Sequence, residues 1–231
     1  MEIQQTTDFR FCKLGLISFP DAMQLEHRLT ELISEEKTKD LLLILQHPPT
    51  VTNGKFGKPE NVLLPLSELE QKGIAFYDSD RGGDATFNCP GQIIVHPIIN
   101  LKHRGARAYI ADLNEMGSRV LSSYGVEADK LSQHPGIWVN GKQIGAVGLR
   151  VSHGISMHGL SLNVNPDLSL FNVINLCGLA GKTATSIEAE IGQTVPMEEV
   201  IQRLIDAFSE VFKVSLSTIS GEQLRELCST G

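Results

Sequence analysis

The hydrophobic pattern at the start of the chain predicts a strand, a helix and a second strand. Phe9 to Ile17 has the composition of a strand, and Pro20 to Thr38 carries apolar residues at helical spacing. The run Leu41 to Gln46 is continuously apolar and ends just before two prolines, as a buried strand does. The chain therefore begins with a β-α-β arrangement.

The next segments alternate between loops and regular structure. Thr50 to Pro65 is rich in Gly, Lys and Asn and is predicted to be a loop, which is where functional residues often lie. A short helix over Leu66 to Lys72 and a strand over Ile74 to Tyr77 follow. Ile93 to Leu101 is a further strand, and Ala108 to Tyr124 is a helix with one apolar face.

The second half of the chain contains the strongest turn signal. Asn140-Gly141 lies between the apolar segments Ile137 to Val139 and Ile144 to Val151, which predicts a hairpin because both turn residues tolerate positive φ. Ile155 to Val164 is predicted to be a strand, and a helix opens at Pro196. We therefore expect an α/β fold with a mixed sheet and flanking helices, formed by residues 1–231 as a single domain.

Composition and charge exclude several classes of protein. The chain is 41% hydrophobic and 20% charged, which is typical of a globular protein. Its net charge is −7 with scattered Lys and Arg, so we expect no nucleic-acid partner. Its opening residues lack the charged-then-apolar pattern of a secretory signal, and no apolar run approaches the ~20 residues that span a bilayer. We expect no membrane partner and a cytoplasmic location, or a mitochondrial or plastid one in a eukaryotic source.

The four cysteines do not form a recognisable framework. Cys12, Cys89, Cys177 and Cys228 are far apart and include no C-x-x-C pair, which argues against disulfide scaffolds and zinc ribbons. We predict no metal site from the sequence. Taken alone, a single cysteine such as Cys177 is more often buried and inert than a nucleophile.

Two further segments combine glycines with potential ligands. In the first, which contains Arg81 to Asn88, paired glycines allow the backbone to approach a ligand closely and the arginine offers a positive charge, although a Gly-Gly turn is often only a turn. The second, which contains Ala146 to Ser161, has small residues that would leave a groove for an extended chain. The alternative is that these small residues allow close packing of strands. The candidate substrate-binding residues are Arg81, Gly82, Gly83, Asp84, Ala85, Thr86, Phe87, Asn88, Ala146, Val147, Gly148, His158, Gly159, Leu160 and Ser161.

Taken in order, five motifs resemble the lipoyl(octanoyl) transferase family from about Leu14 to about Phe212. They are HPPTVTNG from His47, RGGDATFNCPGQ from Arg81, QIGAVGLR from Gln143, HGLSLN from His158 and LCG from Leu176. The resemblance implies a fold like that of biotin and lipoate protein ligases, with no cofactor. Five motifs in the correct order are far more specific than any one of them.

The resemblance also implies a reaction and its partners. Cys177 would accept an octanoyl group from octanoyl-acyl carrier protein as a thioester and pass it to a lysine of an apo lipoyl domain. The acceptors would be lipoyl domains of 2-oxoacid dehydrogenase subunits and the glycine cleavage H protein. An unassisted thiol with a pKa near ~8.5 is mostly protonated at neutral pH, so this chemistry needs a nearby cation.

The sequence departs from the family pattern around the expected site. The position of the family's lysine falls on Gln143, which can hydrogen-bond but cannot supply a positive charge. Lys142 is adjacent, but it would need a bulge or register slip to reach Cys177, because neighbouring strand residues face opposite ways. Asn88 replaces the usual histidine, and Cys89 is either a small apolar filler or one member of a redox-sensitive or metal-binding group with Cys177 and His158.

These departures leave three hypotheses. The first is an active octanoyltransferase, with Cys177 as nucleophile and Lys142 or another group as its activator. The second is a catalytically impaired relative that binds acyl chains or lipoyl domains without efficient turnover. The third is an ATP-using ligase, but that reaction requires a basic phosphate-binding loop with a dedicated lysine, which the sequence lacks.

Overall fold

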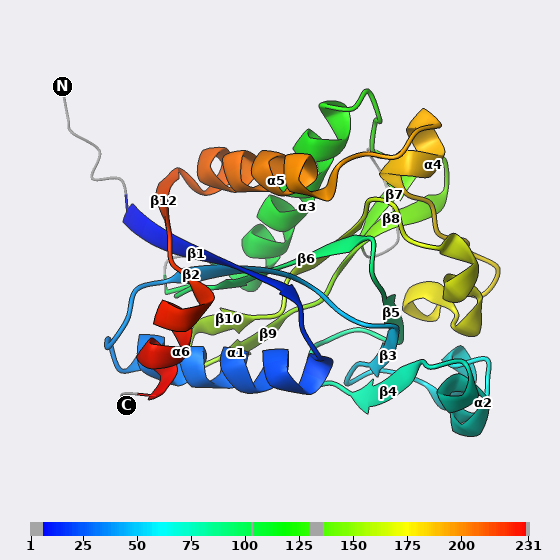
Figure 1. Ribbon diagram of the computed structural model, residues 1–231, viewed down its shortest axis with the longest axis horizontal. Helices are drawn as coiled ribbons and strands as arrows, with labels where there is room; N and C mark the ends of the chain where they lie inside the picture. The colour runs from blue at the N-terminus through cyan, green and yellow to red at the C-terminus, as the bar shows by residue number, and fades with distance from the viewer. Residues whose placement is uncertain (1–6, 103, 130–135, 230–231) are drawn as a thin grey trace.

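A computed structural model describes residues 7–102, 104–129 and 136–229, and its largest sheet has seven strands (Figure 1). Their order is β12-β1-β2-β6-β11-β8-β7. β1 pairs in parallel with both β2 and β12, and the remaining pairs are antiparallel. The predicted mixed sheet is confirmed. Its strands are β1 (Thr7–Leu16), β2 (Leu41–Gln46), β6 (Gln92–Ile98), β7 (Ile137–Val139), β8 (Lys142–Val147), β11 (Leu160–Asn163) and β12 (Val214–Thr218).

Helices cover both faces of this sheet. In Figure 1, α3 and α5 lie on one side and α1 and α6 on the other. The bounds are α1 (Phe19–Ser34), α3 (Ala106–Ser122), α5 (Met197–Phe212) and α6 (Gly221–Ser229). Along β2, Leu42 and Ile44 pack into the α3/α5 core while Leu41, Leu43 and Leu45 pack into the α1/α6 core. The continuous apolar run in this strand is thus explained by burial on both faces.

Two small sheets stand beside the large one. β3 (Thr50–Asn53) pairs with β4 (Ala75–Asp78) and β5 (Thr86–Asn88), and β9 (Arg150–Ser152) pairs with β10 (Ile155–Met157). Short helices link these strands to the rest of the fold. They are η1 (Pro59–Asn61), α2 (Leu66–Gln71), η2 (Leu168–Val173), η3 (Leu176–Gly178) and α4 (Ile187–Ile191).

The predicted hairpin is confirmed. β7 and β8 are joined by Asn140 and Gly141, which have φ of 51° and 75°. The register shifts between Ile137 and Trp138, so that β8 carries one extra residue there. Lys142 nevertheless stays paired with Val139 and its side chain is exposed.

Three of the predicted elements differ from the structure. The expected loop from Thr50 begins with a strand, β3, whose first three residues are buried. The predicted strands Ile144 to Val151 and Ile155 to Val164 are each broken in two, after Val147 and after Met157. The second break lies at His158, whose φ of 60° is incompatible with a strand, and whose N–H donates to Glu26 Oε2 on α1 at 2.7 Å.

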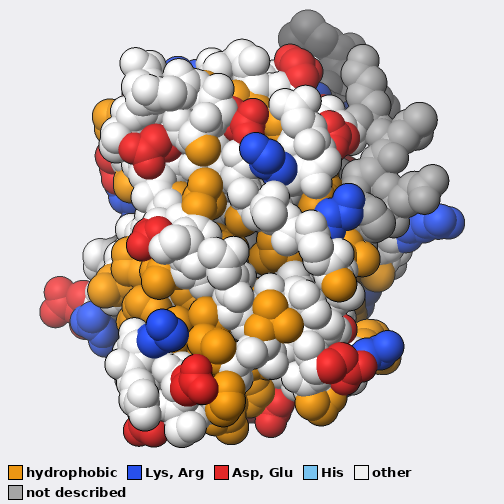
Figure 2. Space-filling model, turned by 90° about the vertical axis from the view of Figure 1, so that its right-hand side faces the viewer, with side chains coloured by type: hydrophobic (Ala, Val, Ile, Leu, Met, Phe, Trp, Pro, Cys, Tyr) orange, Lys and Arg blue, Asp and Glu red, His pale blue; other side chains and the backbone are white. Residues whose placement is uncertain are grey.

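The described part of the chain contains no helix that combines the length and the apolar run needed to cross a membrane. On the face that Figure 2 shows, apolar side chains gather in the middle and lower part, and charged side chains of both signs are interspersed around them. The described atoms on this face therefore form no continuous basic stripe.

Candidate active site

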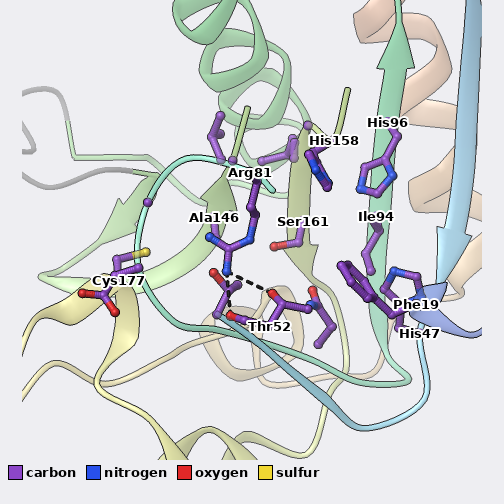
Figure 3. A pocket seen from close by; sticks show the side chains of 18 residues that line it. Phe19, His47, Thr52, Arg81, Ile94, His96, Ala146, His158, Ser161 and Cys177 are labelled. Atoms are coloured by element: carbon purple, nitrogen blue, oxygen red, sulfur yellow. Dashed lines mark hydrogen bonds between the residues drawn. The ribbon is translucent and has the colours of Figure 1, made fainter. Parts of the chain in front are cut away.

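A cavity opens between the small β3-β4-β5 sheet and the end of the large sheet that contains β6, β8 and β11. Figure 3 shows Cys177 on one side, the Arg81 guanidinium in the middle and the rings of His96 and His158 on the other side. Segments far apart in the sequence meet here. The lining residues are Phe19, His47, Thr52, Arg81, Gly83, Asp84, Thr86, Asn88, Ile94, His96, Ala146, Val147, Gly148, His158, Gly159, Leu160, Ser161 and Cys177.

Cys177 is held in a strained turn. It lies in η3 with φ of 51° and ψ of 31°, in the left-handed region that residues other than glycine rarely adopt. Its backbone N–H donates to the carbonyl of Ala85 at 3.3 Å. Gly178 follows with φ of 76°, and a Cβ there would lie 2.6 Å from Asp84 Oδ2. The turn fixes the direction of the thiol and requires a glycine after it.

Gln143 is the side chain that contacts the thiol. Its Nε2 donates to Cys177 Sγ at 3.2 Å, and the side chain is buried. Its backbone is fixed from both sides, because its N–H donates to the Thr183 carbonyl and its carbonyl accepts from the Thr185 N–H. The amide, rather than the ammonium of the exposed Lys142, is therefore the group placed beside the sulfur.

Burial and charge act on the thiol in opposite directions. Burial raises the pKa of Cys177, while the hydrogen bond from Gln143 and the positive charge of Arg81 lower it, with a net increase. A raised pKa keeps most of the thiol protonated at neutral pH. The charge of Arg81 favours the thiolate form, but it does not fully offset burial.

Arg81 is fixed in the centre of the cavity. Its guanidinium donates to the Thr52 carbonyl at 2.7 Å, to Thr52 Oγ1 at 2.9 Å and to the Gly82 carbonyl at 3.1 Å. Burial lowers the pKa of Arg81 to about 10, so it stays protonated at neutral pH. A Cβ at Gly148 would lie 2.9 Å from Arg81 Cδ, which explains why a glycine occupies this position.

The candidate residues from Arg81 to Asn88 divide according to the alternation of a strand. Thr86 and Asn88 line the cavity, whereas Ala85 and Phe87 are buried in the apolar core behind it. Gly82 is not among the lining residues and donates its N–H to the Leu149 carbonyl at 2.9 Å. The remaining candidates all border the cavity, namely Gly83, Asp84, Ala146 to Gly148 and His158 to Ser161.

Cys89 does not share the cavity with Cys177 and His158. It is fully buried in the apolar core behind β5, and burial raises its pKa to about 12. Such a thiol is protonated and unreactive at neutral pH. The filler interpretation of Cys89 fits this environment.

Five residues of the cavity wall were not among the candidates predicted from the sequence. Phe19 lies between the predicted first strand and helix, His47 and Thr52 belong to the HPPTVTNG motif, and Ile94 and His96 belong to a predicted strand. The motif that begins at His47 was a usable signal, since it contains both His47 and Thr52. Nothing in the local pattern singled out His96, which alternates with apolar neighbours along a buried strand.

A buried carboxylate supports the histidine side of the cavity. Glu26 on α1 is fully buried and lies 2.7 Å from His96 Nδ1. Burial alone would raise the pKa of Glu26, but His96 and His158 outweigh it and hold that pKa at about 2. Burial lowers the pKa of His158 to about 4, in spite of the nearby Glu26.

Comparisons of the sequence with known proteins identify one family. The family model of the lipoyl protein ligase A/B catalytic domain matches residues 18–209. An octanoyltransferase of Desulforamulus reducens is 37% identical over 93% of this chain and 96% of its own length. These two matches rest on sequence and cover nearly all of the cavity-forming segments.

Solved structures share the fold. A bipartite lipoate protein ligase structure from Thermoplasma acidophilum, described with its E2 lipoyl domain, covers 96% of this chain and 91% of its own, with a TM-score of 0.76 and 17% identity. A biotin protein ligase from Aquifex aeolicus covers 89% of this chain and 70% of its own, with a TM-score of 0.55 and 14% identity. The fold and the sequence matches together show that the chain belongs to the lipoyl protein ligase A/B catalytic domain family, among relatives that are octanoyltransferases.

Proposed function

We propose that this protein transfers an octanoyl group through a thioester on Cys177 to a lysine of an apo lipoyl domain. The observation that carries the proposal is the placement of Cys177 in a strained turn at a cavity, with Gln143 against its sulfur and Arg81 in the same cavity. The names of the octanoyltransferase relatives support the class of reaction.

The chemistry has two balanced steps. The Cys177 thiolate attacks the carbonyl carbon of an octanoyl thioester, and the donor leaves as a thiolate that takes up a proton. A lysine amine then attacks the new thioester, its amide bond forms, and the Cys177 thiolate returns as the amine proton is lost. Exchange of one thioester for another is nearly balanced, so amide formation drives the sequence.

The proposed donor is octanoyl-acyl carrier protein. The proposed acceptors are lipoyl domains of 2-oxoacid dehydrogenase subunits and the glycine cleavage H protein. The T. acidophilum ligase of related fold, described with an E2 lipoyl domain, supports acceptors of this kind.

Intact-mass measurement tests the proposal. The protein is mixed with octanoyl-acyl carrier protein, and a mass gain of one octanoyl group on Cys177 is expected. Addition of an apo lipoyl domain should move that mass to the acceptor lysine. The Cys177→Ser variant is the control, and octanoylation of the acceptor at the same rate by this variant would contradict the proposed nucleophile.

A second candidate function follows from the same contact. The group beside Cys177 is an amide, which cannot accept the proton of an attacking amine. A relative that binds acyl chains or lipoyl domains without efficient turnover would show ligand binding but no octanoylated acceptor. It would also gain a large increase in rate from Gln143→Lys, alone or with Asn88→His.

A further inference from the structure

Three buried side chains meet beside the cavity, away from Cys177. Glu26 comes from α1, His96 from β6 and His158 from the turn before β11. Their exposed fractions are 0%, 6% and 3%, and one potential ligand atom from each lies within 4.8 Å of the other two. Figure 3 shows the two imidazole rings on the same side of the cavity.

The hydrogen bonding of this cluster is incomplete. Glu26 Oε1 and His96 Nδ1 are 2.7 Å apart, yet neither atom has a partner with hydrogen-bond geometry among the described residues. Buried carboxylate oxygens and ring nitrogens almost always have such partners. The two atoms therefore face each other as a close ion pair that lacks good hydrogen-bond geometry, and neither has another partner among the described residues.

The donor set is one that transition metals prefer. Two imidazoles and one carboxylate form a common three-residue ligand set for zinc and related divalent ions. Ligand atoms around a tetrahedral zinc ion lie roughly 3.3 Å apart, given bond lengths of about 2.0–2.1 Å. Glu26 Oε1 lies 2.7 Å from His96 Nδ1, and Glu26 Oε2 lies 4.0 Å from His158 Nδ1. One of these distances is shorter than about 3.3 Å and the other is longer.

The surroundings of His158 match those of a metal ligand. Its Nδ1 faces Glu26, while its Nε2 lies 2.7 Å from Asp80 Oδ1. Metal-binding histidines commonly donate their second ring N–H to a carboxylate, which fixes the ring and its tautomer. Asp80 is in turn paired with Arg150 and lies 3.2 Å from His27 Nε2.

We propose that Glu26, His96 and His158 form a binding site for one divalent transition-metal ion, with zinc favoured. Asp80 positions His158 from outside the ligand set. Because His96 and His158 both line the cavity, the open fourth position is accessible from it. The site does not depend on the acyl transfer proposed above, which uses Cys177.

Metal content and binding of full-length protein test this proposal. All measurements use the Cys177→Ser background, because thiolates also bind zinc and Cys177 lines the same cavity. After expression with zinc, or titration of the metal-free protein with zinc chloride, we expect one zinc ion per chain and a higher Tm with zinc.

Three variants should weaken zinc binding to different extents. Glu26→Gln and His96→Gln should abolish stoichiometric zinc binding and the zinc-dependent rise in Tm. Asp80→Asn should weaken binding by about 10–100-fold, because it removes only the support of a ligand. His153→Asn is the matched control, since His153 is an exposed histidine outside the cluster.

Several results would overturn the site. They are absence of zinc binding by the parent protein, equal binding by Glu26→Gln, and loss of binding in His153→Asn. If the ligand variants do not fold, the visible absorption of the cobalt-substituted parent protein replaces them. Absorption bands of thiolate ligation, or no bands, would contradict nitrogen and oxygen ligation.

Discussion

Gln143 Nε2 donates a hydrogen bond to Cys177 Sγ at 3.2 Å, so the group beside the proposed nucleophile is neutral. Removing it by Gln143→Ala should raise the thiol pKa by about one unit, because a hydrogen bond to a thiolate is worth roughly 1.5 kcal/mol. The rate of alkylation of Cys177 by iodoacetamide at pH 7 should then fall about tenfold. The rate is measured on the isolated Cys177 peptide by mass spectrometry.

The reverse change introduces a charge. Gln143→Lys should lower the thiol pKa, since an opposite charge within contact distance favours the thiolate by about 1–3 units. The effect should lie at the lower end of that range, because the nearby Arg81 and burial both disfavour a second cation. Lys142→Gln tests whether the adjacent lysine, rather than residue 143, activates Cys177. A tenfold loss of Cys177 reactivity in that variant would identify Lys142 as the activator.

The pH dependence of Cys177 follows from the direction of its shift. Burial raises its pKa above the ordinary thiol value of ~8.5, so the thiolate fraction increases with pH until that higher value is passed. Alkylation of Cys177 should therefore keep rising tenfold per pH unit beyond the point where a small free thiol levels off. A plateau below that of the free thiol would mean that Arg81 and Gln143 outweigh burial.

Much of the fold could be predicted from local pattern. The run LLLILQ required burial on both faces, and Asn140-Gly141 required a tight turn, so β2 and the β7-β8 hairpin followed directly from the residues. The breaks in the later strands could not be predicted in this way. His158 adopts a left-handed conformation because its N–H reaches Glu26, which lies 132 residues away.

The candidate site was predictable where motifs contained it. Arg81, Asn88, Gly148 and His158 all border the cavity with Cys177, as motif order suggested. The contact between Glu26 and His96 could not be predicted, because a charged residue on a helix and a histidine in a buried strand carry no local sign that they meet. Only tertiary packing brings them together.

The turn that presents Cys177 should depend on Gly178. Gly178→Ala places a Cβ 2.6 Å from Asp84 Oδ2, in addition to the cost of about 1–2 kcal/mol for a left-handed alanine. Gly181→Ala is a matched control, because Gly181 has nearly the same φ of 75° but no atom within 4 Å of the Cβ that alanine would add. Both variants should lose stability in urea, but only Gly178→Ala should change the alkylation rate of Cys177.

The contact of α3 with β7 gives a test of the packing itself. Gly117→Ala would improve helix propensity by about 1 kcal/mol, but its Cβ would lie 2.3 Å from Ile137 Cδ1. Overpacking of this kind costs about 1–3 kcal/mol, so the variant should be less stable than the parent by up to ~2 kcal/mol. Chemical denaturation measures the change.

Ile137→Val removes the Cδ1 methyl group that a Cβ at position 117 would contact. Made alone, this change should lower the free energy of unfolding by about 0.5–1.5 kcal/mol. In the Gly117→Ala background it should cost nothing or stabilise, because the new Cβ then occupies the space that Cδ1 leaves. The double-mutant cycle should therefore show a favourable coupling of at least ~0.5 kcal/mol. Additive costs would mean that α3 shifts away from β7 to accommodate the alanine, and that the close approach at Gly117 does not fix the position of the helix.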